Sequence, residues 1–329
     1  MNTTAERWDH LVWFQVQTEG HATDNYMTPV FRNGRQTVPI TILLDARNAA
    51  GEQITLTPQE LSSLTLIDYD TGDLISHVKE KGDYDHYSDY AKNFDPAGST
   101  DSPTPPTPQG VLARTAVATL YITTTSTNTR RIGASIKIPN GSVTFTTNTY
   151  SAEPGGMPTN GKFNSSISVR PVPVLRHTME EFGMDRLDGM GNADFDVDYY
   201  RIYFHDKRFS IRTSHHHLPA EANKYHYVWW KDGQCKFQIA YSAGSGRFVR
   251  FEVYSTSIEF LINTPDGTAT AARIIHKWEP EQLCDSDHKS VQMTYTDNFG
   301  NDADPFWLNN SKDGNFIQFG KYQENSNNT

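Results

Sequence analysis

Three aspartates at alternate positions form the densest acidic group in the sequence. Asp194, Asp196 and Asp198 lie in the run Asp-Phe-Asp-Val-Asp. On a β-strand, alternate residues project from one face and lie about 7 Å apart. Such carboxylates are the oxygen ligands that Ca²⁺ prefers, provided that loop carbonyls or waters complete about six to eight contacts. The pattern predicts a candidate calcium site, and a solvated acidic strand edge is the alternative.

Tryptophan is the second residue type whose placement indicates chemistry. Trp229 and Trp230 are adjacent, and Trp307 ends an Asp-Pro-Phe-Trp run. Successive strand residues face opposite sides, so Trp229 and Trp230 are both buried only if both faces of their strand are covered. An exposed indole beside polar groups is a platform for a sugar ring or a protein. We therefore expect at least one of the three to bind a ligand; burial in a core is the alternative.

Catalytic signals are weaker. In the run Ser214–His217, only His215 and His217 share a strand face and could chelate one ion together. A catalytic zinc needs a third ligand, which nothing in the sequence singles out. There is no HExxH motif, nucleophile elbow, phosphate loop or dinucleotide fingerprint. A glycosidase-type acidic pair stays open, because no pair stands out among the many Asp and Glu residues.

The charge balance excludes one class of partner. The 329 residues include 29 Lys and Arg against 39 Asp and Glu, which gives a net charge of -10. Nonspecific nucleic-acid binding depends on clustered basic side chains, so we expect no nucleic-acid partner. The aromatic fraction of 12% argues against wholesale disorder, because these side chains bury large areas.

The first residues and the cysteines bear on location. The apolar run Leu11–Val16 is too short for a secretory signal, which needs about 7–15 apolar residues after a basic start. We therefore expect a cytoplasmic protein, or one released by a signal-independent route, or one whose signal was removed. No run approaches the roughly 20 apolar residues of a membrane-spanning helix. Without a signal, Cys235 and Cys284 are expected to be separate reduced thiols, although their pairing stays open.

The elements that must position these residues are almost all strands. Alternation over Ala116–Ile122, Ile132–Ile138 and Val143–Thr146 predicts an antiparallel meander with one buried face. Thr178–Met184 is the one expected helix, with Thr178 as its cap. Alternation also marks later segments: Tyr200–Phe204, Tyr225–Trp229, Phe237–Tyr241, Val249–Val253, Ile258–Ile262, Ile274–Trp278, Val291–Tyr295 and Ile317–Phe319.

Two compositional breaks divide the chain. Residues 77–110 form an acidic and proline-rich insertion that ends in the tract Asp101–Pro108, which cannot lie inside a sheet. A Pro-Val-Pro segment interrupts the strands at Arg170–Leu175. We therefore expect an all-β protein of two sandwich-like domains, 1–175 with the insertion and 176–329, the second aromatic-rich and jelly-roll-like.

The first domain resembles the bacterial immunoglobulin-like modules of invasin- and intimin-type proteins. The matching segments are Val38–Gly51, Ala118–Thr125 and Arg131–Ile138, which echo the family's strand, Asp-x-x-Gly turn and returning strand. They cover about a third of the chain, and the insertion departs from the pattern. The resemblance implies an immunoglobulin-like sandwich used as a spacer or adhesive module, and it supplies no catalytic residue.

Together these observations favour a non-enzymatic bacterial protein that binds a surface glycan or a protein, in a host-interaction or virulence setting. A pore-forming or insecticidal-type toxin is the alternative, because the Ser/Thr-rich segment Thr115–Ser151 alternates like a membrane-inserting hairpin. A hydrolase with an unrecognised acidic pair is the second alternative. The sequence leaves the oligomeric state open, a homo-oligomer included.

Overall fold

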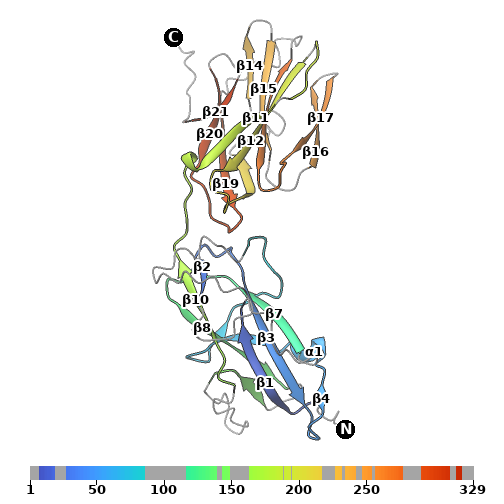
Figure 1. Ribbon diagram of the computed structural model, residues 1–329, viewed down its shortest axis with the longest axis vertical. Coiled ribbons are helices and arrows are strands. Elements are labelled where there is room, and N and C mark those ends of the chain that lie inside the picture. The colour runs from blue at the N-terminus through green and yellow to red at the C-terminus, as the bar shows by residue number, and fades with distance from the viewer. Residues whose placement is uncertain are drawn as a thin grey trace. The chain divides into compact units, whose positions relative to one another are not determined.

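A computed structural model describes most of the chain. The described residues are 7–18, 27–85, 116–138, 143–148, 163–187, 189–193, 195–216, 227–231, 234–241, 247–253, 256–276, 290–311 and 316–320. Nearly every element is a strand, and the sheets pack as sandwich-like layers, so the expected all-β fold is confirmed. The chain divides into two compact units, Met1–Val174 and Leu175–Thr329 (Figure 1). Whether each unit folds alone stays a prediction.

The first unit contains two sheets. The four-stranded sheet consists of β1 (His10–Gln17), β3 (Val38–Arg47), β4 (Gln53–Ile54) and β7 (Ala116–Ile122), and its β3 pairs with each of the other three. The six-stranded sheet runs β2 (Met27–Phe31), β10 (Ile167–Val172), β8 (Arg130–Lys137), β5 (Thr65–Asp68) and β6 (Leu74–Ile75), with β9 (Thr144–Thr146) on β8. The short helix α1 (Pro58–Leu61) precedes β5 and begins with a capping box between Thr57 and Glu60.

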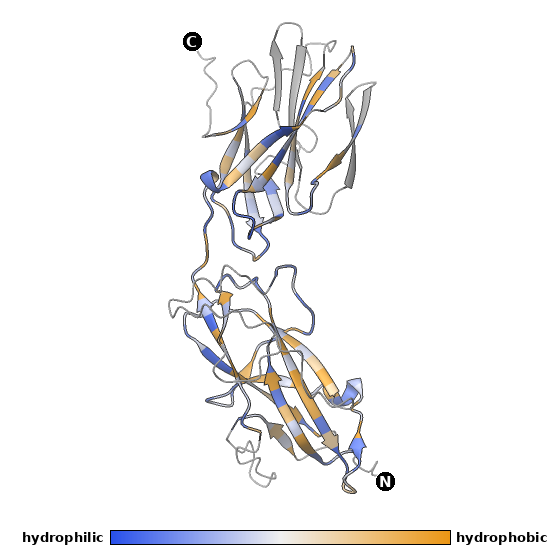
Figure 2. Ribbon diagram, in the orientation of Figure 1, coloured by the Kyte–Doolittle hydropathy of each residue, from blue (hydrophilic) through white to orange (hydrophobic). Residues whose placement is uncertain are grey.

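The core of the first unit lies between these two sheets. Strand β3 turns every second residue inward, and Ile40, Ile42 and Leu44 have no exposed surface. From the other sheet, Ala134 and Ile136 of β8 meet them in one cluster of buried residues. Figure 2 shows hydrophobic residues concentrated on β1, β3 and β7, and hydrophilic residues on the turns. Each fully buried aliphatic side chain contributes about 1.5–3 kcal/mol, so this alternation holds the sandwich together.

The expected three-stranded meander is wrong in its first pairing. Strand β7 pairs with β3 in one sheet, whereas β8 pairs with β9, β5 and β10 in the other. Alternation specifies which face of a strand is buried but not which strand lies beside it, so the sequence could not separate a hairpin from a crossover between sheets. The segment proposed as a membrane-inserting hairpin therefore belongs to both layers of the sandwich.

The predicted insertion begins beside β7. The backbone of Val78 exchanges two hydrogen bonds of 2.8 Å with that of Tyr121. Residues 86–110 of the insertion, with the proline tract, lie outside the described residues.

The second unit contains three sheets. The five-stranded sheet runs β11 (Phe182–Leu187), β12 (Phe195–Phe204), β18 (Ala269–His276), β15 (Gln234–Tyr241) and β14 (Tyr227–Lys231). The four-stranded sheet runs β13 (Ile211–His216), β19 (Ser290–Asp297), β20 (Phe306–Asn310) and β21 (Ile317–Gly320), and β16 (Arg247–Val253) pairs with β17 (Thr256–Ile262). Consecutive residues from Ala271 to Ile275 are all buried, so the central strand β18 is covered on both faces.

The expected helix Thr178–Met184 is wrong beyond its first turn. Only the 3₁₀ turn η1 (Met179–Glu181) forms, and Phe182 already begins β11. A helix this short is marginal without tertiary support. Phe182 instead pairs with Phe204 across the sheet, with ring centroids 4.3 Å apart, and joins the aromatic core. Within the described residues, no helix is long and apolar enough to cross a membrane.

Candidate functional site

The predicted acidic group lies on the five-stranded sheet, where arginines neutralise it. Asp198 of β12 stands opposite Arg273 of β18. The Arg273 guanidinium forms ion pairs with Asp198 and, at 3.2 Å, with Asp196. Arg186 of β11 donates from Nη2 to Asp198 Oδ1 at 2.9 Å. Asp198 and Arg273 are buried, so these charges compensate one another where water does not reach them.

This arrangement bears on the predicted calcium site. A calcium ion held by Asp196 and Asp198 would have to displace the Arg273 guanidinium, whose positive charge opposes a second cation. Asp194 lies outside the described residues. No group of three or more His, Cys, Asp or Glu side chains in the described ranges is arranged to hold a metal. Calcium binding stays a prediction, which the pairing with Arg273 disfavours.

The predicted aromatic residues lie on two strands. Trp229 and Trp230 belong to β14, opposite Lys236 and Cys235, and their side chains lie outside the described part of the structure. Trp307 lies on β20 and is partly exposed, whereas its neighbours Phe306 and Leu308 are buried. The structure therefore leaves Trp307 accessible in part and does not test the other two.

The remaining predicted residues are placed only in part. His215 lies exposed on β13, and its proposed co-ligand His217 is outside the described residues. Cys235 lies on β15, and Cys284 is likewise outside them. Neither pair is therefore brought together or separated by the structure.

Trp13, which the sequence analysis did not single out, lies on β1, at the edge of the four-stranded sheet. The register of β1 against β3 shifts between Leu11 and Trp13, so Val12 is an extra residue in a β-bulge. Leu11 and Phe14 point into the core, whereas Val12 and Trp13 are exposed, Trp13 at 51%. Plain alternation would put Trp13 on the same side as Leu11. The bulge, which shifts the alternation by one residue between Leu11 and Trp13, leaves no simple signal in the sequence.

Polar and apolar groups surround Trp13 on the outer face of this sheet. Trp13 stands opposite Asp45, and Leu43 stands between Gln15 of β1 and Val117 of β7. Val117 is 54% exposed. We call these five residues, Trp13, Gln15, Leu43, Asp45 and Val117, the Trp13 face. Diagonal neighbours across paired strands lie within about 7–8 Å, which is within reach of a large side chain or a ligand.

The charge of the Trp13 face is balanced locally. Arg47 donates to both carboxylate oxygens of Asp45, from Nε at 3.2 Å and from Nη2 at 3.0 Å. The face therefore offers an exposed indole and a partly exposed amide, without an arrangement of nucleophile and base, and the neutralised carboxylate of Asp45 is itself buried. Such a set can stack on a ring and form hydrogen bonds to it.

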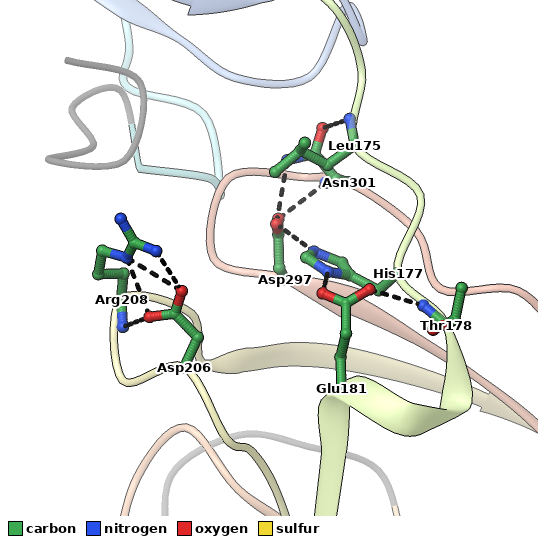
Figure 3. A network of polar contacts seen from close by, with 8 residues as sticks. All are labelled: Leu175, His177, Thr178, Glu181, Asp206, Arg208, Asp297 and Asn301. Carbon is green, nitrogen blue, oxygen red and sulfur yellow. Dashed lines mark hydrogen bonds and ion pairs between the residues drawn. The ribbon is translucent and has the colours of Figure 1, made fainter. Parts of the chain in front are cut away.

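A second unexpected group surrounds His177, where the linker enters the second unit (Figure 3). The ring donates from Nδ1 to Glu181 Oε2 at 2.9 Å and from Nε2 to Asp297 Oδ2 at 3.0 Å. Asp297 also accepts from the backbone N–H groups of Phe299 and Asn301, both at 2.8 Å. Ionised carboxylates only accept hydrogen bonds, so a carboxylate at each ring nitrogen favours the positively charged imidazolium.

The surroundings of His177 explain its charge. Burial lowers the pKa of His177, but the hydrogen bonds and negative charges of Asp297 and Glu181 outweigh this effect, and the pKa is raised above 6.5. The ring packs against Phe204 and Phe209, with centroids 4.7 Å away in both cases. With its side chain only 2% exposed, His177 cannot meet a substrate, so this group is structural rather than catalytic.

Of the two carboxylates that contact His177, the sequence could indicate only one. His177 and Glu181 are four residues apart beside the predicted boundary, a spacing that allows them to pair. Asp297 is 120 residues away in the chain, and it reaches the ring only through the tertiary fold of the second unit. A single sequence does not reveal such a contact.

Comparisons with known proteins give no family. No family model matches the chain, and no curated protein matches it. Similar solved structures include a protein of unknown function from Porphyromonas gingivalis W83, aligned over 88% of this chain and 99% of its own, with 9% identity. Its TM-score of 0.18 is too low to carry an argument about fold or function.

Proposed function

We propose that this protein is a non-enzymatic binding protein whose ligand is a carbohydrate held on the Trp13 face. The observation that carries the proposal is the half-exposed indole of Trp13, which lies on the outer face of the sheet next to a bulge in an otherwise regular strand. Large aromatic side chains are seldom left in water unless a partner covers them. Bulges are over-represented next to functional positions.

The chemistry around the indole favours a sugar. A sugar ring presents apolar C–H groups on its faces and hydroxyl groups around its rim. The Trp13 ring offers a flat surface for the former. Gln15 and Arg47, whose side chains are partly exposed, offer donors and an acceptor for the latter. Because Arg47 neutralises Asp45, the face suits a neutral sugar better than a strongly charged one.

A protein ligand is the second candidate. Val12 and Val117 are exposed on the same sheet as Trp13, and together they add apolar surface of the kind that a protein hot spot uses. Binding to a protein and not to glycans would favour this candidate.

A glycan array tests the proposal. The wild type should bind a defined group of neutral glycans, and Trp13→Ala should lose them. Leu74→Ala is the matched control, because Leu74 is 76% exposed on β6, which belongs to the other sheet of the same unit. Unchanged binding by Trp13→Ala, or no glycan bound by the wild type, would refute the proposal.

A further inference from the structure

The geometry around His177 points to a device that goes beyond ligand binding. We propose that His177 is a proton-controlled latch for the linker. As an imidazolium it holds residues 175–178 against the loop 298–304, and loss of its proton loosens this attachment from the Glu181 side. The latch joins the linker to the second unit, and it does not depend on the function proposed for Trp13.

The linker is attached to that loop by backbone and side-chain contacts. The His177 N–H donates to the Asp302 carbonyl at 3.2 Å, and the Asp304 N–H donates to the His177 carbonyl at 2.8 Å. Leu175 N–H donates to Asn301 Oδ1 at 3.4 Å. The Arg176 side chain forms an ion pair with Asp304. These contacts flank the His177 ring, so the position of the ring and that of the linker depend on each other.

The protonation state of His177 determines whether both ring nitrogens can donate hydrogen bonds. A neutral imidazole has one N–H, so its other nitrogen would present a lone pair to a carboxylate. Asp297 cannot retreat, because it is fully buried and three donors from Phe299 and Asn301 fix it. Glu181 is 44% exposed and can turn toward water. Loss of the proton therefore opens the Nδ1 side, between His177 and Glu181.

Loss of the contact between His177 and Glu181 also affects the linker, because Glu181 of η1 is hydrogen-bonded to Thr178. The other oxygen of Glu181, Oε1, accepts from the Thr178 N–H at 2.8 Å (Figure 3). When Glu181 leaves the ring, this bond weakens as well. The residues between His177 and Phe182 then lose contacts on both sides.

The charged groups that face His177 favour its charged form. Glu181 of η1 and Asp297 of β19 contact the ring. Asp206, in the turn after β12, pairs with Arg208, and the positive charge of His177 also contributes to lowering the pKa of Asp206. Arg176 is paired with Asp304. Because the raised pKa of His177 belongs to the folded state, the latch is closed at low pH and opens as the pH rises through that pKa.

Hydrogen exchange across a pH series tests the latch. Protection factors, which correct for intrinsic exchange, would be measured for peptides that cover 174–178 and 300–305 of the full-length protein, from about pH 5.5 to pH 9. In the wild type, protection should fall as the pH rises. In Glu181→Gln, the amide can donate to Nδ1 and so favours the neutral ring, and the fall should shift to lower pH.

Two further variants complete the test. His205→Gln is the matched control, because the His205 backbone contacts Glu181 but its side chain is not part of the latch; its profile should equal that of the wild type. His177→Gln should show low protection at every pH. Wild-type protection that does not change with pH, or the same midpoint in Glu181→Gln as in the wild type, would overturn the proposal.

Discussion

Burial separates the roles of residues that are similar in the sequence. Trp8 and Trp13 lie in the same part of the chain, yet Trp8 is fully buried against the core and Trp13 is half-exposed. Asp45 and Asp198 both bind arginine, one on an outer sheet face and one inside the second unit. Trp13 can therefore meet a ligand, whereas Trp8, Asp45 and Asp198 are all buried and stabilise the fold.

The buried ion pairs lead to a prediction about stability. Arg273→Met should lower the free energy of unfolding by about 3 kcal/mol, because the buried carboxylate of Asp198 would lose one of the two arginines that pair with it in the described part of the chain. Urea denaturation measures this loss. Arg208→Met is the control: its pair with Asp206 is exposed, so the change should stay below about 1 kcal/mol. Equal losses in both variants would contradict the role assigned to Arg273.

His177 gives a prediction about pH. Its pKa in the folded state is raised above 6.5, so its contribution to stability is complete below the pKa of the unfolded state and is lost as the pH rises through the folded-state value. The stability of the wild type should therefore fall more steeply than that of His177→Gln from about pH 6.5 upward. Denaturation curves across this range would show parallel slopes for the two proteins if the ring were neutral.

At the scale of elements, the bulge in β1 lies next to the candidate ligand site without determining which way Trp13 faces. The residues on both sides of Val12 keep their register with β3, Leu11 opposite Ala46 and Trp13 opposite Asp45. Val12 is therefore an addition to a ladder that is complete without it.

Removal of this residue should be tolerated. Deletion of Val12 leaves Leu11 facing inward and Trp13 facing outward in a regular ladder. We therefore expect a loss of stability below about 1 kcal/mol, which corresponds to a melting shift below about 2–4 °C. Circular dichroism would follow the melting, and acrylamide quenching would report the exposure of Trp13. Unfolding, or a Trp13 shielded from acrylamide, would show that the bulge is needed to hold the strand.

Elements also show how far the sequence could predict this structure. Alternation located strands such as β8, β12 and β15, because burial on one face of a sheet imposes a period of two. It did not assign β7 to a partner, since both possible neighbours accept the same pattern. It did not predict that Trp13 is exposed, because the extra residue Val12 shifts the alternation by one position. The predicted helix Thr178–Met184 was wrong beyond its first turn, because packing in the aromatic core stabilises Phe182 more than a further helical turn would.

For the whole molecule, the division into two units makes a prediction about fragments. The linker residues Leu175 and His177 bind only within the second unit among the contacts given above. A fragment 175–329 should therefore unfold cooperatively. A fragment 179–329, which lacks His177 and leaves Asp297 with an unpaired buried charge, should be less stable. Thermal melts of equal midpoint for the two fragments would contradict the attachment of the linker.

The central claim is that the Trp13 face binds a carbohydrate, and a calorimetric titration tests it most directly. The wild type, Trp13→Phe and Trp13→Ala would be titrated with one glycan selected on the array, after melting curves have shown equal stability. Loss of an aromatic hot spot costs about 2 kcal/mol or more, so Trp13→Ala should bind at least about 30-fold more weakly, with Trp13→Phe between the two. Equal affinities in all three proteins would contradict the account.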